Sequence, residues 1–249
     1  MHIAVLATNT DTSAFAARHP DDGQKFRALI HGMRPDWRIS IFDLPAGDFP
    51  GRLADYDGFV IGGSPASVND DAPWIGRLLR LIPAIVAQNR PLFGACFGHQ
   101  AIAVALGGTV APNPGGWVFG VTETTPTAAA IAAPWMQGDL RPIRVNAAHS
   151  EQVTALPPGA EVISTNSDCA VGAMRIGPFV FTTQYHPEMT ADFIAALVED
   201  YADDLPEPVA AQARRSLGQP ADSYRMAAWI VGFLEQGQVT TARPTGPSR

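Results

Sequence analysis

The chain has 249 residues, of which 46% are hydrophobic, so it is long enough to bury the core of one large α/β domain. Its formal net charge of −7, without any cluster of Lys or Arg, argues against nucleic-acid binding. The first residues lack the basic and long apolar regions of a signal peptide, and no apolar run is long enough to span a bilayer.

Short apolar runs alternate with helical patterns through the first half of the chain. The expected strands are Ile3–Ala7, Trp37–Phe42, Gly58–Ile61 and Pro91–Ala95, and the expected helices are Gln24–Met33, Trp74–Val86 and Phe97–Leu106. Pro83 is expected to kink or break the second helix, and Gly107 to end the third. This order predicts an α/β fold with a central, mostly parallel sheet and helices on both faces.

The second half changes to short strands separated by turn residues. Strands are expected at Val118–Glu123, Ile143–Ala147, Glu161–Ser164, Ala170–Arg175 and Phe179–Gln184, and helices at Ala191–Tyr201, Val209–Leu217 and Asp222–Gln236. Thr124–Pro134 is interpreted as a loop or short helix. The strands are expected to extend the parallel sheet in antiparallel fashion. No linker divides the chain, so we expect a single domain over residues 1–237 and a polar C-terminal tail over residues 238–249.

The most informative motif surrounds Cys96. Gly94 and Gly98 flank it in a Gly-x-Cys-x-Gly pattern, between an apolar run and a helical stretch. This pattern is typical of a nucleophile elbow, a sharp strand-to-helix turn that presents a reactive side chain. A helix N-terminus also favours a thiolate. The alternative is a buried structural cysteine, which is our interpretation of Cys169 in its strand-like run. With no CxxC pair and no secretory context, we expect reduced thiols and a cytoplasmic protein.

A cysteine nucleophile needs a base and a group that orients the base. His186 and Glu188 follow a predicted strand, and Pro187 between them favours extended backbone, which puts both side chains on one side. A carboxylate beside an imidazole fixes its tautomer and stabilises its protonated form. The alternative is a turn that ends the strand with a solvated acid.

A third segment, Gly62-Gly63-Ser64, also follows a predicted strand. Glycines there allow backbone N–H groups to point into a site, and with the N–H of Phe97 they could stabilise an oxyanion. A tight turn after a buried strand is the alternative. All three segments lie at the carboxyl ends of strands, where open α/β sheets place their sites.

Together these segments resemble the class I, or triad, glutamine amidotransferases, including the amidotransferase domains of GMP synthetases and the plant γ-glutamyl peptidases. The resemblance covers about Tyr56 to Glu188 and is most specific at Gly94-Ala-Cys-Phe-Gly-His-Gln100 and Gln184-Tyr-His-Pro-Glu188. It implies a flavodoxin-like fold, with Cys96 as nucleophile, His186 as base and Glu188 as its orienting carboxylate.

The resemblance also implies substrate-binding roles. Gln100 would contact the substrate, and the segment His149-Ser150-Glu151 would receive its α-amino acid end. The oxyanion turn departs from the family pattern, because Gly63-Ser64-Pro65 stands where Gly-Gly-Pro is common, so the donor is the N–H of either Gly63 or Ser64. Ala95 replaces a bulkier aliphatic residue before the cysteine.

The implied reaction is hydrolysis of the γ-amide of glutamine or of a γ-glutamyl compound through a γ-glutamyl thioester, without a metal or other cofactor. The sequence has no loop for nucleotide activation. The chain is therefore either a free-standing hydrolase or a subunit that delivers ammonia to a separately encoded synthetase. A non-catalytic module that binds a metabolite on the same fold is the third hypothesis.

Overall fold

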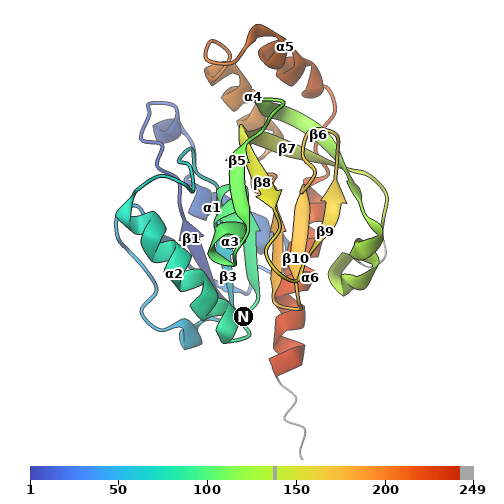
Figure 1. Cartoon of the computed structure of the whole chain (residues 1–249). Coiled ribbons are helices and arrows are strands. Elements are labelled where there is room, and N and C mark those ends of the chain that lie inside the picture. The colour runs from blue at the N-terminus through green and yellow to red at the C-terminus, as the bar shows by residue number, and fades with distance from the viewer. Residues whose placement is uncertain (137–138, 242–249) are drawn as a thin grey trace, which may run out of the picture.

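The computed structural model describes residues 1–136 and 139–241, with side chains described as far as Gln236. In this part of the chain a nine-stranded sheet forms the centre of the molecule (Figure 1). Its strands run from one edge to the other as β2 (Arg38–Asp43), β1 (His2–Ala7), β3 (Gly58–Ile61), β4 (Leu92–Ala95), β11 (Val180–Thr183), β10 (Ala173–Ile176), β9 (Ala160–Thr165), β6 (Val118–Pro126) and β7 (Ile143–His149). A separate small sheet pairs β5 (Thr109–Pro112) with β8 (Glu151–Ala155).

The main sheet has a parallel part and an antiparallel part. Strands β2, β1, β3, β4 and β11 pair in parallel, whereas β10, β9, β6 and β7 continue the sheet in antiparallel fashion. The fold class expected from the sequence is therefore confirmed. The α-helices are α1 (Asp22–Met33), α2 (Pro73–Ala87), α3 (Phe97–Ala105), α4 (Ala191–Asp200), α5 (Glu207–Ser216) and α6 (Ser223–Thr241). The short 3₁₀ turns are Ala16–Arg18, Leu53–Asp55, Ala128–Ala132 and Pro134–Met136.

Helices cover both faces of the parallel strands, and this explains why those strands read as continuous apolar runs. In β1, Ile3 and Val5 pack on one side with α1 and α6, whereas Ala4 and Leu6 pack on the other with α2 and α3. A third cluster joins α4 and α5 to one end of β6, where Figure 1 draws them above the sheet.

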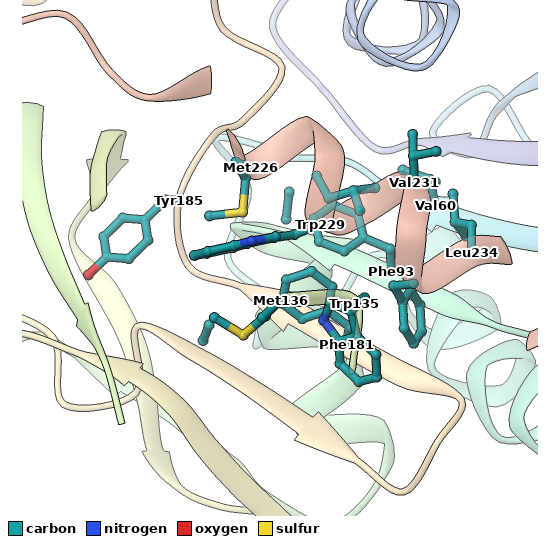
Figure 2. Packing of buried hydrophobic residues seen from close by; sticks show 14 of the residues in the cluster. Val60, Phe93, Trp135, Met136, Phe181, Tyr185, Met226, Trp229, Val231 and Leu234 are labelled. Atoms are coloured by element: carbon teal, nitrogen blue, oxygen red, sulfur yellow. The ribbon is translucent and has the colours of Figure 1, made fainter. Parts of the chain in front are cut away.

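The core beneath α6 fixes the two strands that lead into the site. Phe93 of β4 and Phe181 of β11 lie with their ring centroids 5.2 Å apart, and Trp135 packs against Phe181 at 5.7 Å (Figure 2). Because the strands are parallel, with Ala95 opposite Thr183, their carboxyl ends meet at one edge of the sheet. Cys96 and Gln184 follow these two residues directly, so the core holds two distant segments side by side.

Several sequence-based expectations need correction. Helix α2 is continuous through Pro83, so the expected break does not occur. Pro83 lies on the exposed face, where the carbonyl group that it leaves without a donor can be hydrated. Strand β6 continues through Pro126, where a loop was expected, because its end pairs with β9. Cys169 lies in the turn between β9 and β10 rather than in a strand.

At the C-terminus, α6 continues to Thr241, so the expected polar tail would begin later than Gln238, and residues 242–249 lie outside the described residues. Among the helices described, none is long and apolar enough to cross a membrane.

Candidate active site

Cys96 occupies a strained turn between β4 and α3. Its backbone angles are φ 48° and ψ −104°, a left-handed conformation that a non-glycine residue adopts only when its surroundings enforce it. Two hydrogen bonds do so: the N–H of Cys96 donates to Thr183 at 2.9 Å, and the N–H of Gly98 donates to Gly62 at 3.0 Å. A Cβ on Gly98 would overlap the carbonyl group of Ile61, so the Gly-x-Cys-x-Gly pattern is a steric requirement of this turn.

The side chains of His186 and Glu188 form a buried pair. His186 Nδ1 lies 2.7 Å from Glu188 Oε1, so Nδ1–H donates to the carboxylate and Nε2 faces away from it. Burial alone would lower the pKa of His186. The negative charges of Cys96 and Glu188 outweigh it and raise that pKa well above its ordinary value. Both groups therefore act on the imidazole ring, whose buried Nε2 makes no hydrogen bond to another described residue.

Gly63 lies against both Cys96 and His186. A Cβ at Gly63 would be 2.7 Å from His186 Cε1 and 3.7 Å from Cys96 Cβ. The Thr8 hydroxyl donates to the carbonyl oxygen of Gly63 at 2.9 Å. Because a trans peptide directs its N–H opposite to its carbonyl, this bond also fixes the direction of the Ser64 N–H. Phe97 is the first residue of α3, so its N–H has no acceptor within the helix.

Gly63→Ala is expected to lower activity by about 10²-fold while the protein remains folded, because a displacement of the imidazole by about 1 Å has this effect. Glu188 holds the His186 ring, so relieving the overlap with the added Cβ must move either the ring or the Gly63 turn from its position in the wild type. The comparison is kcat/KM for Gly63→Ala and for Gly32→Ala, whose added Cβ meets nothing within 4 Å. Equal activity of the Gly63 variant and the wild type would contradict this geometry.

A cleft of about 640 Å³ opens onto the sulfur. Its lining includes eight of the ten residues singled out from the sequence: Gly63, Ser64, Cys96, Gln100, His149, Ser150, Glu151 and His186. The other two, Glu188 and Phe97, lie outside the cleft lining. The Glu188 side chain is fully buried beside His186, and Phe97 packs against Trp74 in the core.

The segment that was expected to receive the substrate's amino acid end lies on one side of Cys96. The carbonyl oxygen of Glu151 accepts from Gln100 Nε2 at 3.0 Å and from His149 Nδ1 at 3.1 Å. The Glu151 carboxylate accepts from the hydroxyl of Ser67 at 3.0 Å. The carbonyl oxygen of Ala148 is 3.9 Å from Cys96 Sγ, so this segment lies directly beside the sulfur.

Sequence reasoning missed Gln184 as a contact of the sulfur. Gln184 Nε2 lies 3.6 Å from Cys96 Sγ, and its Oε1 accepts from Gln100 Nε2 at 3.3 Å. Gln184 is completely buried, although it is polar and directly follows an apolar strand. A polar residue directly after a buried strand was the sequence signal for this contact, because a buried amide must be hydrogen-bonded. The same applies to Thr8, which follows β1.

Two buried histidines, His149 in the cleft lining and His99 in α3, are neutral in the folded protein. Burial lowers the pKa of His149 to about 4 and that of His99 to about 3, from 6.5. With Nδ1–H donating to Glu151, the Nε2 of neutral His149 is an acceptor. The second thiol is inert by the same criterion, because burial raises the pKa of Cys169 to about 12.

These two histidines predict a loss of stability in acid. Unfolding exposes both rings, which then bind protons below pH 6.5, whereas the folded rings stay neutral until the pH approaches their lowered pKa. The free energy of unfolding should therefore fall as the pH drops from 6.5 towards 4, by about 1.4 kcal/mol per pH unit for each histidine. His186 is shifted oppositely, so its contribution is lost only as the pH rises. Urea unfolding at pH 7 and pH 5 measures the slope, which His99→Gln should reduce; equal stability at both pH values would contradict the prediction.

Comparison with known proteins identifies a family. Residues 37–194 match the model of glutamine amidotransferase class-I. The chain is 31% identical to γ-glutamyl peptidase 4 of Arabidopsis thaliana over 64% of each chain. It is 30% identical to a subunit of the glutamine-hydrolysing GMP synthase of Halobacterium salinarum, over 68% of this chain and 86% of that one. Both expected resemblances are confirmed.

A solved structure shows the same fold over nearly the whole length. The crystal structure of a glutamine amido transferase from Methylobacillus flagellatus matches with a TM-score of 0.76 at 23% identity, covering 99% of this chain and 97% of that one. At this identity the match supports the architecture of the sheet and helices.

Proposed function

The chain belongs to the class I glutamine amidotransferases, and from this premise we propose that it hydrolyses the γ-amide bond of glutamine or of a γ-glutamyl compound, with Cys96 as nucleophile. The observation that carries the proposal is the convergence of three residues: Cys96 and His186 lie beside Gly63 in the lining of one cleft, and buried Glu188 holds the His186 ring. These three residue types fill the roles that covalent catalysis requires: a thiolate, a proton carrier and a group that orients the carrier.

In the proposed mechanism the Cys96 thiolate attacks the γ-carbonyl carbon, and the carbonyl oxygen takes the negative charge as an oxyanion. The N–H of Phe97, with that of Ser64 or Gly63, donates to this oxygen. His186 transfers a proton to the leaving ammonia or amine as the C–N bond breaks, which leaves a γ-glutamyl thioester on Cys96. His186 then removes a proton from water, which attacks the thioester, releases glutamate and restores the thiolate.

The hydrogen bond from Thr8 to the carbonyl oxygen of Gly63 favours the N–H of Ser64, rather than that of Gly63, as the second oxyanion donor. The Thr8 hydroxyl holds the carbonyl of the Gly63–Ser64 peptide and so fixes the direction of the Ser64 N–H. Fixed donors stabilise a developing charge without reorganisation. Gln100, His149, Ser150 and Glu151 are proposed to bind the α-amino acid end, with neutral His149 Nε2 and the Glu151 carboxylate as acceptors for its ammonium group.

The test is a turnover screen of the purified chain with glutamine and with several γ-glutamyl amides, each measured by release of glutamate. We expect turnover by the chain alone, as a free-standing, cytoplasmic hydrolase. Turnover of glutamine only after addition of a synthetase would instead favour the ammonia-delivering role, the alternative that the similarity to the Halobacterium salinarum protein supports. Complete inactivity, with no preferential alkylation of Cys96 by iodoacetamide, would favour a metabolite-binding module.

A further inference from the structure

The cleft extends beyond the space that a glutamine side chain requires. Its volume of about 640 Å³ lies in the range that encloses drug-sized ligands, whereas the leaving group of glutamine is a single ammonia. If the glutamyl part binds along Gln100 and His149–Glu151, the remaining volume adjoins the leaving-group side of Cys96. The side chains that line this volume can therefore select the amine that leaves.

Three aromatic rings line the cleft. Phe119 and Tyr201 have centroids 5.4 Å apart, and Trp117 lies 5.9 Å from Phe119 and 6.4 Å from Tyr201. Phe119 pairs across the sheet with Ala148, whose carbonyl oxygen is 3.9 Å from Cys96 Sγ. The three rings and Asp11 are hereafter called the aromatic wall. Strand β7, which contains Ala148, lies between Phe119 and Cys96.

Asp11 adds a negative charge to the rings. Burial is the main cause that raises the pKa of Tyr201, and the charge of Asp11 is the next, so the carboxylate lies within electrostatic range of the phenol. One carboxylate oxygen of Asp11 accepts from the N–H of Ser13 at 2.8 Å, and Asp11 is part of the cleft lining. Aromatic faces beside a carboxylate are the surroundings that attract an organic cation.

The rest of the cleft does not offset this charge. Its described lining includes the carboxylates of Asp11, Asp21, Asp22, Asp43 and Glu151, and its one Lys or Arg side chain is that of Lys25. Lys25, which lies 3.6 Å from the centre of the Phe193 ring, is paired with Asp22 at 2.8 Å, so these two charges compensate each other. The carboxylates of Asp11, Asp21, Asp43 and Glu151 remain. An anionic leaving group would meet repulsion here.

We propose that the aromatic wall binds the leaving group, and that it selects γ-glutamyl amides of amines that carry a second, positively charged nitrogen. This inference rests on the proposed function, because it assumes that Cys96 cleaves a γ-glutamyl bond. It distinguishes the chain from a peptidase for ordinary γ-glutamyl peptides, whose leaving groups end in a carboxylate. The chemistry of the bond that breaks is unchanged, and the free amine leaves with the proton from His186.

Three matched substrates test the proposal: the γ-glutamyl amides of 1,4-diaminobutane, butylamine and 4-aminobutyrate. Their leaving groups share a four-carbon chain and end in an ammonium, a methyl or a carboxylate group. We expect kcat/KM to decrease in that order, with at least about a tenfold difference between the cationic and anionic substrates. This ratio should also decrease as ionic strength rises.

Substitutions in the aromatic wall test whether it causes the preference for the cationic substrate. Asp11→Asn keeps an acceptor for the Ser13 N–H but removes the charge, so it should reduce the cationic-to-anionic ratio about threefold or more. Tyr201→Leu should lower kcat/KM for the cationic substrate more than for the butylamide. Asp203→Asn is the control, because Asp203 is exposed in the turn that contains Tyr201 but lies outside the cleft lining. This variant should leave the cationic-to-anionic ratio unchanged.

The outcomes separate this inference from the proposed function. Equal turnover of all three substrates, or preference for the anionic one, would overturn the role of the wall while leaving Cys96-dependent hydrolysis intact. The same ratio in Asp11→Asn and wild type would also overturn it. Failure to cleave any of the three substrates or glutamine would instead contradict the proposed function.

Discussion

Cys96→Ala is expected to lower the rate of γ-glutamyl hydrolysis by about 10⁴-fold or more while the protein remains folded. Without the sulfur no thioester can form, and a water molecule in its place lacks both its nucleophilicity and its fixed position. Alanine leaves the fold intact because its backbone N–H can make the same hydrogen bond to Thr183. The measurement is steady-state release of glutamate, with circular dichroism to confirm folding.

The matched control is Cys169→Ala, which removes the other thiol. Cys169 is completely buried in the turn between β9 and β10, and its raised pKa keeps it protonated, so this variant should retain most of the activity. Residual turnover in Cys96→Ala close to that of wild type would exclude Cys96 as nucleophile. Equal losses in the two variants would show that the effect is on folding.

Glu188→Gln is expected to lower kcat about 10³- to 10⁴-fold, an effect of the size that follows loss of the orienting carboxylate in other triads. The Glu188 side chain is fully buried, and its Oε1 accepts from His186 Nδ1 at 2.7 Å. A glutamine amide can donate to that nitrogen and so favour the tautomer with its proton on Nε2, which cannot accept the proton of the thiol. It also removes a charge that raises the pKa of His186.

The pH profile distinguishes this role from a structural one. In Glu188→Gln the pKa of His186 should decrease, so the pH dependence of kcat/KM should shift to lower pH along with the loss of rate. Glu199→Gln is the control, because Glu199 forms an exposed ion pair with Arg214 outside the cleft and should change neither quantity. A Glu188→Gln enzyme with wild-type rate and profile would contradict the assigned orientation of the imidazole.

The meeting of Cys96, His186 and Glu188 was predictable from sequence because each lies in a local pattern directly after an apolar strand. A local pattern indicates the local geometry of each segment. Because parallel strands end at the same edge of a sheet, the segments that follow them are expected to lie close together. The same reasoning identified the Gly62-Gly63-Ser64 turn. The catalytic and substrate-binding roles of these residues stay predictions until activity is measured.

Other parts of the site could not be predicted, because they depend on the antiparallel extension of the sheet. Trp117, Tyr201 and Asp11 belong to distant segments without a shared motif, and only the folded chain brings them into the lining of one cleft. Strands β5 and β8 were missed because each is short and lacks a clean alternation of apolar and polar residues. Pro83 does not break α2, and its place on the exposed face of the helix was not evident from a proline within an apolar helical pattern.

The most direct measurement is mass spectrometry of the protein quenched with acid during turnover of a γ-glutamyl amide, followed by mapping of the modified peptide. We expect a γ-glutamyl group on the peptide that contains Cys96, which disappears when the substrate is exhausted and never forms in Cys96→Ala. Consumption of substrate with Cys96 unmodified at every time, or with the group on another residue, would contradict it.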